Sequence, residues 1–65
     1  MNLNLKIARL KKGLSQDDVC RLSGIGRTTL SKLENGEGDP KLSVMLKLSG
    51  VLEISIEELF FSKEE

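Results

Sequence analysis

Residues 13–36, GLSQDDVCRLSGIGRTTLSKLENG, contain the pattern that decides the fold. Each half of this stretch repeats apolar residues at the spacing of a short amphipathic helix. Ser23–Gly26 separates the two halves, and Gly24 stands where the first helix has to end in a left-handed residue, a conformation that glycine adopts without steric cost. A short helix, a tight glycine turn and a second short helix form a helix-turn-helix. We therefore predict a helix-turn-helix at about residues 16–35.

Three of the predicted helices begin with similar signals. Ser15 precedes the first of them, and Asp18 follows three residues later, which is the pattern of a reciprocal capping box. Ser55 and Glu58 repeat this pattern near the C-terminus. Gly26 stands at the equivalent place before the second helix of the helix-turn-helix. That helix is therefore expected to begin without a side-chain cap, at a loss of about 0.3 kcal/mol.

Helical periodicity also extends over residues 3–12 and 42–52, and no segment alternates with the period of two that indicates a strand. We therefore expect an all-α single domain over residues 1–65, with five helical segments. The side chains expected in its core are Leu3, Ile7, Leu10, Val19, Leu22, Leu30, Leu33, Leu42, Met45, Leu46 and Leu52. Val44, Leu48 or Val51 is expected to lie partly outside the core.

The composition excludes several classes of function. The chain has 65 residues with one Cys and no His, Trp or Tyr. Transition-metal sites and nucleophilic triads are built largely from Cys and His, so we expect no metal, no cofactor, no catalytic residue and no enzymatic activity. No stretch approaches the roughly 20 apolar residues of a membrane span. A single Cys forms no internal disulfide, which favours a cytoplasmic location.

The charges are distributed unevenly although the formal net charge is zero. Residues 1–32 hold seven basic and two acidic side chains, a net charge of +5. Residues 33–65 hold three basic and eight acidic side chains, a net charge of −5. The N-terminal half is therefore able to face phosphate groups, although the same charges are equally compatible with an ordinary solvated surface.

Several short motifs follow one another in a characteristic order. They are Gly13-Leu14-Ser15-Gln16, Val19-Cys20, Ser23-Gly24-Ile25, Thr29-Leu30-Ser31, Leu33-Glu34-Asn35-Gly36, Pro40-Lys41-Leu42, Leu46-Lys47-Leu48 and Ile54-Ser55 followed by Glu57-Glu58-Leu59. In this order and spacing they resemble the Cro/repressor (XRE-type) family, over roughly residues 7–60. The resemblance implies a compact five-helix bundle that binds double-stranded DNA sequence-specifically and acts as a small transcriptional regulator, typically a repressor.

The resemblance also implies that the third helix lies in the major groove. The face of this helix that Leu30 and Leu33 leave free carries four side chains with hydrogen-bonding groups. The predicted base-reading residues are Arg27, Thr28, Ser31 and Lys32. Arginine and lysine are side chains that read the O6 and N7 atoms of guanine, and a threonine methyl contacts thymine. The alternative is an ordinary solvated helix face.

Four further positions match residues that contact the DNA backbone in the family, namely Gln16, Thr29, Asn35 and Lys41. Gln16 begins the second helix, where free backbone amides and the helix dipole favour a phosphate. Three of these assignments have a structural alternative. In these alternatives, Gln16 is an ordinary residue of the first helical turn, Asn35 only ends its helix, and Thr29 has a buried, cap-like role.

Three other positions are assigned structural roles. Arg9 and Glu34 match a pair that bridges the first and third helices in some relatives and that fixes the reading helix without touching bases. Removing one partner of such a bridge strands the other. Cys20 stands where the family usually has alanine, so a packed and inert thiol is expected rather than a redox sensor.

The length of the chain favours a dimer. One reading helix covers only a few base pairs, and the family binds as a two-fold homodimer to a near-palindromic operator with half-sites about 34 Å apart. Adjacent phenylalanines on a helix do not both point into one core. We predict a dimer interface that consists of Val51, Ile54, Leu59, Phe60 and Phe61. The alternative is that the extra aromatic folds back over the edge of its own monomer.

A second function stays open at this point. The acidic C-terminal half and its two phenylalanines are also compatible with an antitoxin-like or other protein-interaction module that binds its own operator. A steep fall of DNA affinity with salt favours a stand-alone regulator, whereas a co-purifying protein favours the module. Neither alternative predicts a membrane or a small-molecule ligand as a partner.

Overall fold

The computed structural model describes residues 3–61, with side chains for residues 4–60. Every regular element in this range is helical, which confirms the predicted all-α fold. Among the described helices, none is long and apolar enough to cross a membrane. The elements are α1 (Leu3–Lys11), α2 (Gln16–Ser23), α3 (Arg27–Glu34), α4 (Leu42–Leu52) and η1 (Glu57–Phe61), a single turn with π-helical hydrogen bonding.

Local sequence signals explain where α2 and α3 begin and end. The Ser15 side chain accepts a hydrogen bond from the backbone N–H of Asp18, and the Asp18 carboxylate accepts one from the backbone N–H of Ser15, as the capping-box pattern predicts. The helix ends at Gly24, whose φ of 79° lies in the left-handed region. Gly26 precedes α3 in an extended conformation without a side-chain cap, again as predicted.

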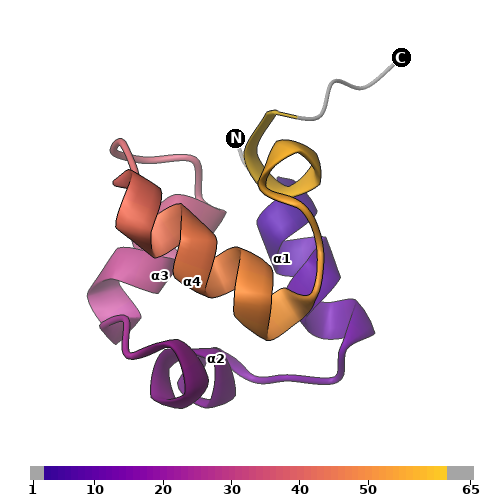
Figure 1. The fold of residues 1–65 in the computed structure, drawn as a ribbon. Coiled ribbons are helices and arrows are strands. Elements are labelled where there is room, and N and C mark those ends of the chain that lie inside the picture. The colour runs from indigo at the N-terminus through magenta and orange to yellow at the C-terminus, as the bar shows by residue number, and fades with distance from the viewer. Residues whose placement is uncertain (1–2, 62–65) are drawn as a thin grey trace.

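The helices enclose one small core. In Figure 1, α4 crosses the front of the molecule, α2 lies below it, α3 lies to its left, and α1 lies to its right. The turn η1 packs against α1, so the C-terminal part of the described chain returns to its N-terminal helix. The side chains that are almost fully buried come from all five elements. They are Leu5, Val19, Leu30, Leu48, Leu52 and Leu59.

The predicted inner face of α1 is wrong. Leu5 and Ala8 are buried, whereas Ile7 and Leu10 are 45% and 56% exposed. A helix of nine residues offers two apolar stripes here, and periodicity does not choose between them. The buried ion pair between Arg9 and Glu34 selects the stripe, because it turns the side of α1 that carries Leu5 and Ala8 inward.

The predicted core positions in α2 and α4 also need correction. Leu22, Leu42 and Leu46 were expected inside but are 54%, 62% and 56% exposed. Leu48 was expected partly outside and is fully buried. Most positions of α4 are apolar, so its sequence indicates no unique inner stripe, and packing against α2 selects the stripe around Leu48 and Leu52.

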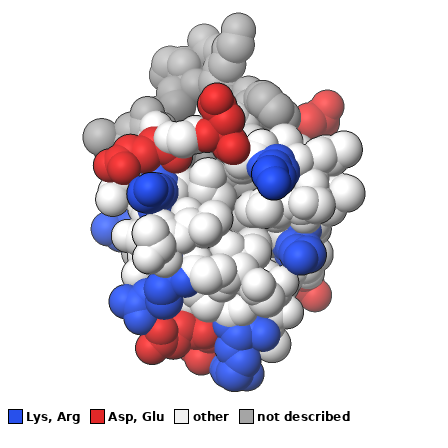
Figure 2. All heavy atoms as spheres, turned by 90° about the vertical axis from the view of Figure 1, so that its left-hand side faces the viewer, with Lys and Arg blue, Asp and Glu red and all other residues white. Residues whose placement is uncertain are grey.

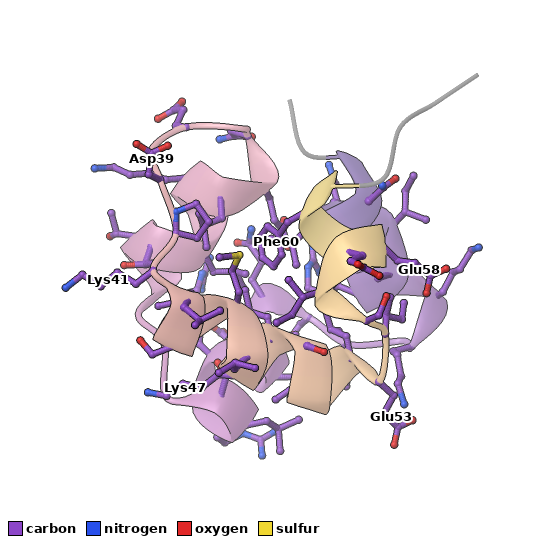
Figure 3. The ribbon with its side chains drawn as sticks, turned by 45° about the horizontal axis from the view of Figure 1, so that its top comes forward. Asp39, Lys41, Lys47, Glu53, Glu58 and Phe60 are labelled. Carbon is purple, nitrogen blue, oxygen red and sulfur yellow. The ribbon has the colours of Figure 1, made fainter. Side chains whose placement is uncertain are left out.

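The predicted dimer residues do not share one environment. Leu59 is 1% exposed and belongs to the core of the monomer, so its assignment to a dimer interface is wrong. Val51, Ile54 and Phe60 are half-buried and pack against the core. Figure 3 shows the Phe60 ring pointing toward the middle of the molecule. The side chain of Phe61 lies outside the described part of the chain.

Candidate nucleic-acid interface

The four residues that were predicted to read bases lie together on the outer side of α3. Leu30 and Leu33 anchor the opposite side of the helix in the core. Arg27, Thr28 and Lys32 are exposed and Ser31 is half-buried. Positions i, i+1, i+4 and i+5 share one helix face, so the outer surface of α3 presents only side chains with hydrogen-bonding groups. Such a surface has the chemistry needed to contact base edges.

The residues that were predicted to contact phosphates lie at the ends of three helices. Gln16 is the first residue of α2, Asn35 ends α3, and Lys41 immediately precedes α4. Thr29 is exposed in the first turn of α3, so the alternative of a buried cap does not apply to it. No DNA contact of Lys47 was predicted from the sequence. Figure 3 shows that it points outward on the same side of the molecule as Lys41.

The charge on this side of the molecule is mixed rather than uniformly basic. Figure 2 faces the left-hand side of Figure 1, where α3 lies, and shows Lys and Arg side chains around an uncharged centre. Asp and Glu side chains occupy the upper and lower edges of the same view. Glu37 and Asp39 are exposed in the loop before α4, and Figure 3 shows Asp39 near the side on which Lys41 lies. Acidic side chains therefore accompany the basic ones on this side of the molecule, as in the chain as a whole.

An exposed ion pair lies at the outer edge of the helix-turn-helix. Arg27 Nη1 donates to Asp17 Oδ1, which joins the first turn of α3 to the first turn of α2. The two side chains are 58% and 75% exposed. An ion pair in this environment contributes at most about 1 kcal/mol, because water and salt screen it. Arg27 is therefore held only weakly and is able to exchange Asp17 for another partner.

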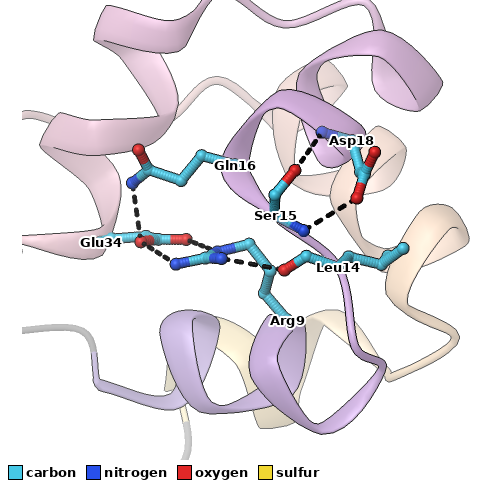
Figure 4. A network of polar contacts seen from close by, with 6 residues as sticks. All are labelled: Arg9, Leu14, Ser15, Gln16, Asp18 and Glu34. Carbon is cyan, nitrogen blue, oxygen red and sulfur yellow. Dashed lines mark hydrogen bonds and ion pairs between the residues drawn. The ribbon is translucent and has the colours of Figure 1, made fainter.

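A buried polar network lies beneath the helix-turn-helix (Figure 4). Arg9 Nε donates to Glu34 Oε2 at 2.6 Å, and Arg9 Nη2 donates to Glu34 Oε1 at 3.2 Å. Arg9 Nη1 also donates to the carbonyl oxygen of Leu14 at 2.9 Å. Gln16 Nε2 donates to Glu34 Oε1 at 3.0 Å. The structure thus brings Arg9 and Glu34 together, and it adds Gln16, which the sequence did not place with them.

The network satisfies the charges that it buries. Arg9 is 7% exposed and Glu34 is 5% exposed. Among the described residues, no buried side-chain nitrogen or oxygen lacks a hydrogen-bond partner. A buried charge is tolerated only when its partners are in place, so each member of this network holds the position of the others.

Two titratable groups of α2 have shifted pKa values. Hydrogen bonds from the backbone and the side chain of Ser15 hold the pKa of Asp18 below its usual value, and Arg21 lowers it further. Burial raises the pKa of the Cys20 thiol. A raised thiol pKa leaves less reactive thiolate at neutral pH, which is consistent with the packed role that was expected for Cys20.

Comparison with known proteins identifies the family. The sequence pattern of the helix-turn-helix family matches residues 5–59. The chain belongs to the Cro/repressor (XRE-type) helix-turn-helix family. Members of this family are DNA-binding transcriptional regulators, and the match includes the whole of α2, α3 and α4.

Individual members of the family are similar over most of this chain. An uncharacterized HTH-type transcriptional regulator of Methanocaldococcus jannaschii is 29% identical over 65 residues, which cover 100% of this chain and 98% of the relative. The cryptic phage CTXphi transcriptional repressor RstR of Vibrio cholerae is 34% identical to this chain. The similarity covers 91% of this chain and 54% of the length of RstR.

A solved structure shares the fold. The restriction-modification controller protein C.AhdI from Aeromonas hydrophila superimposes with a TM-score of 0.83 and is 37% identical. The similarity covers 91% of this chain and 89% of the controller protein. A similarity of this extent confirms that the five helical segments have the arrangement of a helix-turn-helix regulator.

Proposed function

We propose that this protein represses transcription by placing α3 in the major groove of a specific operator. The observation that carries the proposal is the outer face of α3, which presents Arg27, Thr28, Ser31 and Lys32 while Leu30 and Leu33 anchor the helix. One relative of this chain is named as a transcriptional repressor, which supports repression rather than activation. The proposal assigns no enzymatic step, and it places the protein in the cytoplasm with the DNA.

Contacts to the DNA backbone would set the register of α3 in the groove. Gln16 and Thr29 lie in the first turns of α2 and α3, where free backbone N–H groups favour an anion. Asn35 and Lys41 lie on either side of the loop between α3 and α4. Such contacts position a protein on DNA without reading its sequence.

We further propose that the protein binds as a homodimer to a near-palindromic operator. One α3 reads only a few base pairs, and two copies related by a two-fold axis read half-sites about 34 Å apart. Val51, Ile54 and Phe60 are half-buried near the C-terminal end of the described chain, and they remain the interface candidates together with Phe61. This assignment omits the buried Leu59.

Selection of bound sequences from a random duplex pool, repeated at two salt concentrations, tests the proposal. A repressor of this kind should enrich a two-fold symmetric sequence, and its affinity should fall steeply as salt increases. Sedimentation with full and half operators then tests the dimer. A protein that enriches no sequence, or that binds half-sites as tightly as palindromes, contradicts the proposal. A protein partner that co-purifies with the chain would favour the interaction module that also binds its own operator.

A further inference from the structure

The side chain of Gln16 is held from beneath by an acidic residue that lies away from the outer face of α3. Gln16 begins α2 and is half-buried, and its Nε2 donates to Glu34 Oε1 at 3.0 Å. Glu34 itself is 5% exposed at the end of α3, on the buried side of that helix. An exposed glutamine samples many rotamers, whereas this one has a fixed partner.

The rest of the network fixes Glu34 and thereby the start of α2. Arg9 donates twice to the Glu34 carboxylate and once to the carbonyl oxygen of Leu14. Leu14 and Gln16 lie on either side of Ser15, the N-cap of α2. The network therefore holds the chain both before and after the cap, at the helix terminus that is proposed to meet a phosphate.

The carboxylate also determines which way round the amide of Gln16 lies. A carboxylate only accepts hydrogen bonds, so the amide nitrogen of Gln16, and not its oxygen, has to face Glu34. One N–H of the amide group is used in this contact. The other N–H stays available to a further acceptor, and a phosphate oxygen is such an acceptor.

We infer that Glu34 is a positioning residue for DNA binding, which orients the Gln16 amide so that its second N–H donates to a phosphate. The inference rests on the proposed contact between Gln16 and the DNA backbone. The inference predicts an unexpected direction for the change in DNA affinity when Glu34 is replaced. The loss of a negative charge alone should strengthen binding to DNA. Loss of Glu34 should instead weaken binding, since the Gln16 amide is then no longer oriented.

Operator affinity of four proteins tests the inference: the wild type, Glu34→Gln, Gln16→Met and the double variant. Binding is measured at a temperature where circular dichroism shows all four to be folded. Glu34→Gln should bind about tenfold more weakly, the size of effect expected for one hydrogen bond to a charged group. In the Gln16→Met background the same change should have no further effect. Glu37→Gln is the matched control, because it removes an exposed acid and should leave affinity unchanged or slightly higher.

The outcomes distinguish the proposed phosphate contact of Gln16 from the inferred positioning role of Glu34. If Gln16→Met binds all duplexes as well as the wild type, the proposed phosphate contact of Gln16 is wrong and the inference falls with it. If Gln16→Met binds weakly but Glu34→Gln binds normally, or if Glu34→Gln weakens binding equally in both backgrounds, only the inference about Glu34 is overturned.

A measurement on the wild-type protein decides the matter if the Glu34 variants do not fold. Gln16 is the single glutamine of the sequence, so its side-chain amide signals in nuclear magnetic resonance spectra are distinct in kind from those of the asparagines. Relaxation of the Gln16 amide nitrogen should show a rigid group in the free protein, with the exposed Asn35 as the mobile control. Addition of operator should shift one of its two amide protons more than the other. A Gln16 amide as mobile as that of Asn35 would overturn the inference.

Discussion

Two ion pairs of the same chemical type lie in opposite environments, one beneath the helix-turn-helix and one on its surface. Arg9 and Glu34 meet in the interior, beneath α2 and α3, with side chains that are 9% and 4% exposed. Asp17 and Arg27 meet at the outer edge of the same two helices, with side chains that are 58% exposed for Arg27 and 75% exposed for Asp17. Each pair joins two different helices, but only the first is shielded from water.

This difference separates a structural role from an exchangeable one. A buried charge has lost its hydration and has to keep its protein partners, so the Arg9–Glu34 pair determines where α1 and α3 lie. An exposed charge keeps most of its hydration, so Arg27 is able to leave Asp17 at little cost when a base or a phosphate is offered. Burial, rather than the distance between the charged atoms, decides which pair defines the fold.

The largest effect is expected at the buried pair. Glu34→Ala should lower the free energy of unfolding by about 3 kcal/mol, because it leaves the Arg9 guanidinium buried without its partner. Chemical denaturation measures the change, and Glu37→Ala, at an exposed acid, should change stability by less than about 0.5 kcal/mol. A double-mutant cycle between Arg9 and Glu34 gives their coupling directly. A coupling of zero would show that the two do not meet in solution.

The next effect concerns DNA rather than stability. Arg27→Ala should weaken binding to the selected operator by about 1–3 kcal/mol and should change binding to random DNA little, since Arg27 is proposed to read bases. Lys32→Ala should behave in the same way. Gln16→Ala should instead weaken all duplexes similarly, as expected for a phosphate contact. Equal losses on operator and random DNA for Arg27→Ala would make Arg27 a phosphate contact and overturn its assignment.

A smaller effect is expected at Ser15, the N-cap of α2. Ser15→Ala should lower stability by about 1 kcal/mol, because Asp18 loses the hydroxyl that accepts its backbone N–H. Ser43→Ala, at an exposed serine of α4, is a suitable control. An unchanged midpoint of denaturation for Ser15→Ala would show that the capping box contributes nothing to the fold.

The same cap should make stability depend on pH in the acid range. The pKa of Asp18 is lowered in the folded protein by its hydrogen bonds with Ser15. A lowered folded-state pKa means that the contribution is complete above the usual pKa of aspartate and is lost as the pH falls through the lowered value. Asp18→Asn should therefore flatten the dependence of stability on pH below about pH 4. An identical acid profile for wild type and variant would contradict this prediction.

The smallest effect on stability is expected at the exposed pair. Asp17→Asn should change the free energy of unfolding by less than about 0.5 kcal/mol. It should also raise the affinity for random DNA, because it removes a negative charge near the proposed interface. Titration with random duplexes at low and high salt measures this gain. A large loss of stability would show that the two ion pairs are more alike than their exposures indicate.

Local chemistry made much of the architecture predictable. The Ser15 cap, the left-handed Gly24 and the uncapped Gly26 each depend on a few neighbouring residues, and the structure shows all three. The predicted limits of the fourth helix, residues 42–52, agree with those of α4. The polar outer face of α3 follows from the positions of Leu30 and Leu33, because residues on a helix are related by a fixed rotation.

The sequence by itself therefore determined the all-α fold, the helix-turn-helix and the side of α3 that faces outward. The tertiary structure alone decided which stripe of α1 and α4 is buried, since Leu5 and Leu48 compete with apolar neighbours that are equally suited to a core. It also joined Gln16 to the ion pair of Arg9 and Glu34, and it buried Leu59 within the monomer. These contacts join residues far apart in the chain, and local periodicity carries no information about which distant side chains will meet.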